Sequence, residues 1–140
     1  MKEVNVGVGI IILSIPENKI LLGKRSKKHS HGVNTWCSPG GHIEFGETPE
    51  DAITRETFEE VGLKVRSLRY IGFTNDVFKK EEKHYITLWF ETNIFTGKIK
   101  DTDELKNVAW FSIKKLPKLL FLSTENYLKK FEKYIYYKYN

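Results

Sequence analysis

GHIEFGETPEDAITRETFEEVGL, residues 41–63, contains the clearest helix signal in the chain. Thr48 is a strong N-cap residue, Pro49 occupies the favoured first helical position, and Gly62 is a typical helix end. Three residues spaced i, i+4 and i+8 form an apolar stripe: Ile53, Thr57 and Val61. We therefore expect a helix between Thr48 and Gly62, with this stripe facing the core.

Beside that stripe, the helix gathers carboxylates. Glu56, Glu59 and Glu60 are spaced i, i+3 and i+4, so they fall within an arc of roughly 100°. Like charges this close repel, at a cost of about 0.2–0.5 kcal/mol per pair. A hard cation such as Mg²⁺ prefers oxygen ligands and binds through a few carboxylates together with substrate phosphates. The alternatives are thus a metal-binding face and a solvated acidic face.

Length and composition indicate one globular domain. The chain has 140 residues, of which 40% are hydrophobic and 29% charged, which is ordinary for a folded protein. It contains no internal repeat, low-complexity tract or linker-like stretch, so we expect residues 1–140 to form a single domain.

Several classes of protein are disfavoured. The single cysteine, Cys37, cannot form an intramolecular disulfide, and the N-terminus lacks the pattern of a signal peptide, so we expect a cytoplasmic protein. The longest apolar run, Val8–Leu13, is too short to span a bilayer and favours a buried strand, without a membrane partner. The net charge is +5, but the lysines are scattered, which indicates a solvated surface rather than a nucleic-acid interface.

Apolar alternation and turn residues predict a sheet around the helix. The expected strands are Val4–Ser14, Ile20–Lys24, Trp36–Ser38, Val65–Asn75, His84–Asn93 and Val108–Phe111. Asn126–Tyr139 keeps helical spacing through Leu128, Phe131, Ile135 and Tyr139, so we expect an amphipathic helix packed on the sheet. Strands interleaved with few helices indicate an α/β or α+β domain.

Residues 41–63 resemble the Nudix box, G-x5-E-x7-R-E-U-x-E-E-x-G-U, in which U is a bulky apolar residue. The matching residues are Gly41, Glu47, Arg55, Glu56, Glu59, Glu60, Gly62 and Leu63. The one departure is Thr57, whose methyl group can still pack on the core stripe. The resemblance to Nudix hydrolases implies an α/β fold: an α/β/α sandwich with a mixed sheet, in which the box forms a loop–helix–loop.

The same resemblance implies a reaction and its metal site. Nudix hydrolases cleave a nucleoside diphosphate linked to another moiety, using Mg²⁺ or Mn²⁺. By position, the implied metal ligands are the Gly41 carbonyl, Glu56, Glu59 and Glu60. Glu47 would pair with Arg55 and hold the loop on the helix. The candidates for the catalytic base or an extra ligand are Glu59, Glu60, Glu44, and Asp103 or Glu104 from a later loop.

Substrate contacts are expected outside the box. Arg25, at the end of the second strand, and His42 are candidates for phosphate binding, with a surface salt bridge and a solvent-facing loop position as the alternatives. A base could stack on one aromatic residue, and a polar neighbour could read its edge. These candidates, most of which could instead be core residues, are Phe73, Phe78, Tyr85, Trp110, Asn75 and Asp76.

WCSPGGHIEFGE, FTNDVF and HYITLWF resemble the MutT-like nucleoside triphosphate pyrophosphohydrolases. This resemblance implies that a nucleoside triphosphate, with modified dNTPs among the candidates, is cleaved to the monophosphate and pyrophosphate. We expect a monomer or homodimer. The alternatives are a hydrolase of ADP-ribose or another nucleoside diphosphate derivative, and a non-catalytic nucleotide- or RNA-binding module. A zinc site could be imagined at His29, His31, Cys37 and His42, but their spacing matches no zinc-binding pattern. Cys37 lacks a partner base, which favours a buried thiol over a nucleophile.

Overall fold

The computed structural model describes residues 2–139 of the chain, and the surroundings of side chains for residues 2–131. The elements along the chain are β1 (Val4–Ser14), β2 (Lys19–Arg25), β3 (Trp36–Cys37), β4 (Gly40–His42), α1 (Pro49–Val61), β5 (Lys64–Arg66), β6 (Arg69–Phe78), β7 (Lys83–Thr92), β8 (Ile94–Thr96), β9 (Leu105–Ser112) and α2 (Leu122–Tyr139). In the described part of the chain, no helix is long and apolar enough to cross a membrane.

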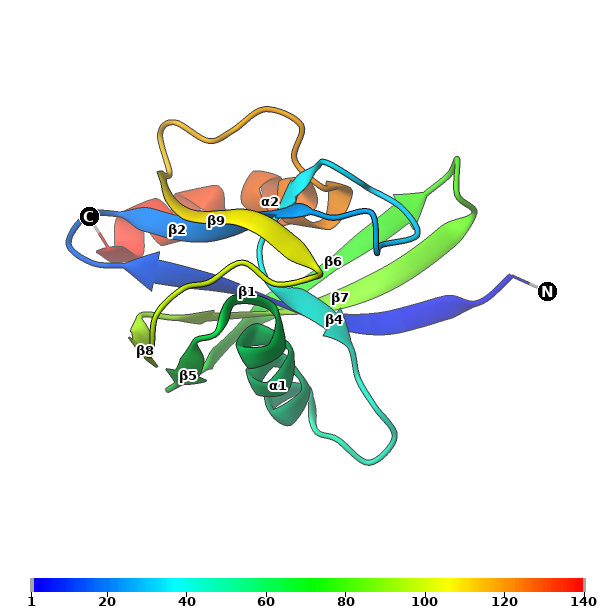
Figure 1. The fold of residues 1–140 in the computed structure, drawn as a ribbon, viewed down its shortest axis with the longest axis horizontal. Helices are drawn as coiled ribbons and strands as arrows, with labels where there is room; N and C mark the ends of the chain where they lie inside the picture. Colours follow the sequence, from blue (N-terminus) through cyan, green and yellow to red (C-terminus); the bar gives the residue numbers. More distant parts are fainter. Residues whose placement is uncertain (1, 140) are drawn as a thin grey trace.

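The main sheet is mixed and is built around β1. The strand order is β3-β2-β1-β7-β6, with β4 also paired to β1 and β9 also paired to β2. β1 runs parallel to β7 and antiparallel to β2 and β4. β5 and β8 form a separate two-stranded sheet, which lies next to α1 in Figure 1.

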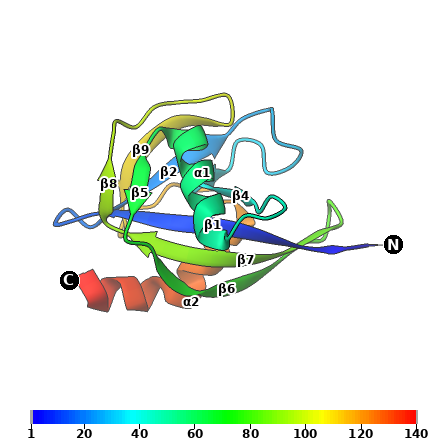
Figure 2. The same ribbon diagram turned by 90° about the horizontal axis from the view of Figure 1, so that it is seen from below.

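The two helices cover opposite faces of the sheet (Figure 2). On one side of β1, Val8, Ile10 and Ile12 belong to the core cluster that contains the apolar residues of α1. On the other side, Ile11 and Leu13 belong to the cluster that contains Tyr127 and Leu128 of α2. The continuous apolar run of β1 is therefore explained by burial on both faces, and the predicted α/β/α sandwich is confirmed.

Local sequence sets the ends of α1. The Thr48 Oγ1 atom accepts a hydrogen bond from the Asp51 N–H at 3.0 Å, and Pro49 begins the helix. Gly62 ends it with a φ of 83°, a left-handed conformation that a glycine adopts without steric cost. Thr57 is fully buried, and its hydroxyl donates to the Ile53 carbonyl, so this departure from the usual apolar residue is satisfied within the helix.

The structure differs from the predicted elements in several respects, including the start of β9, which begins at Leu105 and not at Val108. The single strand expected over Val65–Asn75 is wrong: Ser67 adopts a φ of 55°, which interrupts extended backbone and separates β5 from β6. The short strands β4 and β8 were not predicted. α2 begins at Leu122, four residues before the expected start. Leu128 and Phe131 pack in the core as expected, whereas the side chains of Ile135 and Tyr139 lie outside the described part.

Candidate active site

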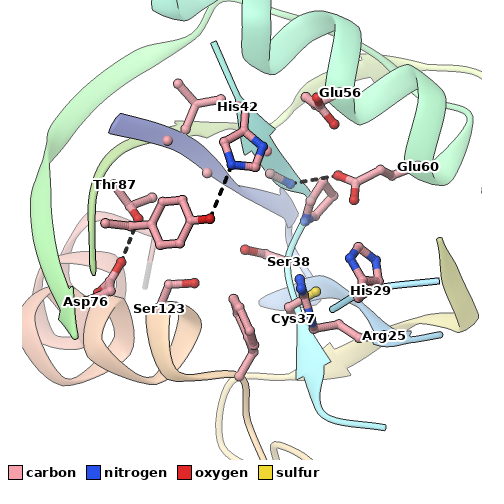
Figure 3. A pocket seen from close by; sticks show the side chains of 18 of the residues that line it. Arg25, His29, Cys37, Ser38, His42, Glu56, Glu60, Asp76, Thr87 and Ser123 are labelled. Atoms are coloured by element: carbon pink, nitrogen blue, oxygen red, sulfur yellow. Dashed lines mark hydrogen bonds between the residues drawn. The ribbon is translucent and has the colours of Figure 1, made fainter. Parts of the chain in front are cut away.

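A pocket of about 280 Å³ lies between α1, the centre of the sheet and the start of α2. Figure 3 shows Glu56 and Glu60 of α1 at one end, with His29 near Glu60 and Arg25 farther away, beside Cys37. Asp76, Thr87 and Ser123 lie at the opposite end (Figure 3). The pocket therefore joins an acidic end, which contains Glu56 and Glu60, to an opposite end that is lined by aromatic and hydroxyl-bearing side chains.

The acidic end brings together residues that are far apart in the sequence. Glu56 and Glu60 come from α1, and Glu104 lies immediately before β9. Ligand atoms of Glu60, Glu104 and His29 all lie within 4.8 Å of one another. Gly41 packs against this end, since a Cβ atom there would lie 2.6 Å from Oε2 of Glu56. Only glycine leaves room for the Glu56 carboxylate in this position.

Glu60 is the most deeply buried carboxylate at this end, with 3% of its surface exposed. Its Oε1 accepts a hydrogen bond from the Gly40 N–H at 2.8 Å. Within residues 2–131, no cationic side chain forms an ion pair with it. Burial raises the pKa of Glu60 well above its usual value, and burial also raises the pKa of Glu56. A bound cation would therefore stabilise the charged form of both carboxylates.

Arg55 connects the loop to the helix. Its Nε and Nη2 donate to the two carboxylate oxygens of Glu47 at 2.8 and 2.9 Å, a bidentate pair. Nη1 reaches Oε1 of Glu56 at 2.9 Å, and Nη2 donates to the His42 carbonyl at 3.1 Å. Hydrogen bonds from Arg55 lower the pKa of Glu47 to about 2. The predicted Glu47–Arg55 contact is present, and it also fixes the position of Glu56.

Two of the predicted catalytic carboxylates lie outside the pocket lining. Glu59 is half-exposed, and its Oε2 lies 3.3 Å from Nη1 of Arg55. Glu44 is largely exposed, with Oε1 3.7 Å from the same nitrogen, while its N–H donates to Glu47. Both face Arg55 at the rim of the acidic end, so the structure separates them from Glu56 and Glu60, which line the pocket.

The phosphate candidates Arg25 and His42 both line the pocket. Arg25 lies flat against Phe121, with its Cζ atom 3.9 Å from the ring centroid, and its Nε donates to the His31 carbonyl. The Nε2 atom of His42 lies 3.3 Å from the Tyr85 hydroxyl; a dashed line at His42 in Figure 3 marks this contact. Arg25 thus lines the same pocket as Glu56 and Glu60, so its guanidinium is a candidate for contact with an anionic ligand.

The opposite end combines aromatic rings with a buried carboxylate. Tyr85 and Phe78 are among the rings that line it. Asp76 is fully buried, and its Oδ2 accepts a hydrogen bond from the Thr87 hydroxyl at 2.6 Å. Its Oδ1 accepts from the Asn126 side chain at 2.9 Å. Oδ2 also accepts a hydrogen bond from the Thr74 hydroxyl at 3.2 Å. Acceptor capacity therefore remains at Oδ1, which suits recognition of an N–H group on a ligand.

Alternation along β6 separates the predicted base contacts. Asp76 and Phe78 point into the pocket, whereas Phe73 and Asn75 lie on the exposed face of the strand and do not line it. Phe73 instead faces Lys130 of α2, whose Nζ lies 4.5 Å from the ring centroid. These neighbours differ only in which face of β6 they occupy, and alternation in the sequence does not show which of the two faces points into the pocket.

The remaining candidates, and the pocket residues that were not predicted, carried weaker sequence signals. Trp110 packs against the core cluster on the α1 side and does not line the pocket. Phe121 and Ser123 were not predicted because they lie in an irregular stretch and at the first turn of α2. Cys37 is buried, and burial raises the pKa of its thiol to about 12, so the expected buried thiol is confirmed. The metal-capable cluster found among the described residues unites His29 with two glutamates.

Known proteins resemble the chain in sequence and fold. The NUDIX domain model matches residues 4–131. An "ADP-ribose pyrophosphatase" from Methanocaldococcus jannaschii is 38% identical over 107 residues, 75% of this chain and 61% of that protein. An "Oxidized purine nucleoside triphosphate hydrolase" from Danio rerio is 34% identical over 107 residues, 76% of this chain and 67% of that protein.

A solved MutT NUDIX hydrolase from Burkholderia pseudomallei superposes with a TM-score of 0.82 at 26% identity, covering 91% of this chain and 97% of that chain. The chain spans about three fifths of the length of the archaeal relative. The domain match covers most of the sequence, and the loop–helix–loop, the Glu47–Arg55 pair and the two glutamates of α1 that line the pocket occupy the positions that the box assigns to them. The chain therefore belongs to the NUDIX domain family.

Proposed function

We propose that this protein is a metal-dependent pyrophosphohydrolase that cleaves a nucleoside triphosphate to the monophosphate and pyrophosphate. The observation that carries the proposal is the shape of the pocket. It joins the carboxylates of Glu56 and Glu60 at one end to aromatic rings and a buried aspartate at the other, and Arg25 lines the same pocket. A nucleotide has the same order of chemical groups: a polyphosphate that needs cations, and a flat base with N–H donors.

The acidic end fits a hard divalent cation. Glu60 is a buried carboxylate with one backbone hydrogen bond, and Glu56 and Glu104 lie beside it, so the donor set consists mainly of the oxygen ligands that Mg²⁺ and Mn²⁺ prefer. We propose that these three residues and the Gly41 carbonyl would hold the cation. When bound, such a cation neutralises phosphate oxygens and makes a bound water easier to deprotonate.

The protein's own residues then divide the remaining work. Arg25 would bind a phosphate oxygen, and Tyr85 would stack on the base while Asp76 accepts a hydrogen bond from its edge. Arg55 is a positioning residue that fixes the Glu56 carboxylate. Glu59 and Glu44 stand exposed at the rim, where either can accept the proton of a reacting water that the pocket orients.

ADP-ribose is the second candidate substrate. Its support is the 38% identity to the archaeal protein named ADP-ribose pyrophosphatase. ADP-ribose shares the base and the phosphoanhydride with a nucleoside triphosphate, and it differs in carrying a second ribose beyond the diphosphate. The same acidic end would serve both reactions, so only the products distinguish them.

The proposal is tested with the purified protein, Mg²⁺ and ¹⁸O-labelled water against a panel of nucleoside triphosphates, oxidised dNTPs and ADP-ribose. We expect monophosphate and pyrophosphate from triphosphates, with the label in one of these two products, as detected by mass spectrometry. Preferential conversion of ADP-ribose to AMP and ribose phosphate would contradict the proposed substrate, whereas the proposed metal site would stand. Binding without turnover of any compound would contradict an enzymatic role.

Gly41→Ala tests the packing of the acidic end. The added methyl group would collide with the Glu56 carboxylate, which Arg55 holds in place, so the carboxylate must move away from the pocket. We expect kcat to fall about 10- to 100-fold, the range typical of disturbing a group that orients a metal ligand, while the melting temperature changes little. Phe45→Ala, at a fully exposed position in the loop that follows β4, provides a control for changes near this segment.

Burial of Glu60 also predicts how stability depends on pH. Its folded pKa is raised above the ordinary value of 4.5, so between these two pKa values the unfolded chain loses a proton that the folded protein retains. In a chelator, the contribution of Glu60 to the free energy of unfolding should therefore fall as the pH rises from about 4.5. Glu60→Gln should flatten this dependence in urea unfolding measured across the pH range. An unchanged slope in the variant would assign the dependence to other groups.

A further inference from the structure

His29 is held at the acidic end by a folded loop. It lies between β2 and β3, and its N–H donates to the Ser26 carbonyl at 3.2 Å. The Glu104 carbonyl accepts hydrogen bonds from the Ser26 N–H, at 3.1 Å, and from Nε2 of His29, at 3.0 Å. The loop that carries His29 is thereby fastened to the segment that carries Glu104, so both side chains reach the pocket together.

The hydrogen bond of His29 determines which ring nitrogen is free. A carbonyl oxygen only accepts hydrogen bonds, so Nε2 carries the proton and Nδ1 of the neutral ring keeps its lone pair. Histidines that bind metals usually donate their other ring N–H to a carbonyl or carboxylate, which fixes the tautomer and the orientation of the ring. His29 has this arrangement, and one of its nitrogens lies within 4.8 Å of carboxylate oxygens of Glu60 and Glu104.

We propose that His29 supplies a nitrogen ligand to the cation held by Glu60 and Glu104, an inference that rests on the metal site of the proposed function. A mixed set of one imidazole and carboxylates favours transition-metal cations over Mg²⁺, because imidazole is a softer ligand than oxygen. The site would then accept Co²⁺ or Mn²⁺ more tightly than an all-oxygen site of the same charge, and Mg²⁺ would gain little from the histidine.

The second histidine of the pocket provides a matched control. His31 belongs to the same loop, but its ring packs edge-on against Phe78, with centroids 4.7 Å apart, and also contacts Phe121. It is not a member of the cluster formed by His29 and the two glutamates. Removing the His31 imidazole changes the same loop and the same pocket without changing the proposed ligand set.

The test uses the full chain with Mn²⁺ and no nucleotide, followed by electron spin echo envelope modulation, which detects nitrogen bound to Mn²⁺. We expect imidazole ¹⁴N modulation in the unmodified protein and in His31→Gln, and none in His29→Gln. Labelling only histidine with ¹⁵N should replace the ¹⁴N modulation with ¹⁵N modulation, without any substitution in the protein. Glutamine can still donate a hydrogen bond to the Glu104 carbonyl, so His29→Gln separates metal binding from fastening of the loop.

Calorimetric titration supplies a second readout. In His29→Gln we expect the Kd for Co²⁺ to rise about tenfold or more, the Kd for Mg²⁺ to change less than about twofold, and His31→Gln to leave both values near those of the unmodified protein. Bound Mn²⁺ without nitrogen modulation, or modulation that persists in His29→Gln, would overturn the role of His29 and leave the metal site standing. A protein that binds no divalent cation would overturn both this inference and the metal-dependent function.

Discussion

Glu60→Gln should lower kcat about a hundred- to a thousandfold while leaving the fold intact. The carboxylate is buried at the acidic end, and a glutamine of the same shape can still accept the hydrogen bond from the Gly40 N–H. It cannot, however, supply the negative charge that a cation and the developing transition state require, and losing such a group typically costs several kcal/mol of transition-state stabilisation. Steady-state kinetics with saturating Mg²⁺ and the preferred nucleotide measure this effect.

The melting temperature of Glu60→Gln should not fall with kcat. Without metal, the buried carboxylate costs desolvation energy, so the neutral amide should leave the melting temperature unchanged or raise it. Glu50→Gln, the same change at an exposed position in the first turn of α1, should leave kcat near that of the unmodified protein. A Glu60→Gln variant with near-normal kcat would refute the catalytic role of the acidic end.

Arg55→Ala should damage stability and rate together. The substitution removes the bidentate contact with Glu47, the hydrogen bond to the His42 carbonyl and the contact that fixes Glu56. Because these bonds tie the loop between β4 and α1 to the helix, we expect the melting temperature to fall by about 5–10 °C. The displaced Glu56 carboxylate should lower kcat about 10- to 100-fold, as expected when a residue that orients a metal ligand is lost.

Arg66→Ala serves as the control for Arg55→Ala, because Arg66 is exposed on β5. Surface substitutions of this kind usually change the free energy of unfolding by less than about 0.5 kcal/mol. Differential scanning calorimetry and kcat should therefore both separate the two variants. If Arg55→Ala lost activity but kept full stability, the guanidinium would act in the reaction itself and not as a support for the loop.

Local signals predicted the parts of the fold that local chemistry determines. The N-cap at Thr48 and the left-handed Gly62 fix the ends of α1, and both act within a few residues of the chain. The bounds of β1 were also predicted, because its apolar run is buried on two faces. The break between β5 and β6 was missed, since nothing in the composition around Ser67 indicates its positive φ.

In the candidate site, too, the residues set by local sequence were predicted and those set by long-range contacts were not. Gly41, Glu56 and Glu60 were found because the box places them at fixed spacings on one loop and helix, and the structure brings all three to the pocket. The contacts at the other end depend on which face of β6 points inward, so Asp76 could not be separated from Asn75 by sequence alone. His29 comes from a loop whose position depends on hydrogen bonds to Glu104, which are long-range in sequence.

The most direct test of the account is a crystal structure of the protein with Mn²⁺ and a non-hydrolysable nucleotide analogue, with anomalous scattering used to locate the metal. The account predicts a Mn²⁺ peak bound by Glu56 and Glu60, the phosphates between this peak and Arg25, and the base beside Tyr85 and Asp76. Anomalous density elsewhere on the protein, or a nucleotide bound outside this pocket, would contradict it.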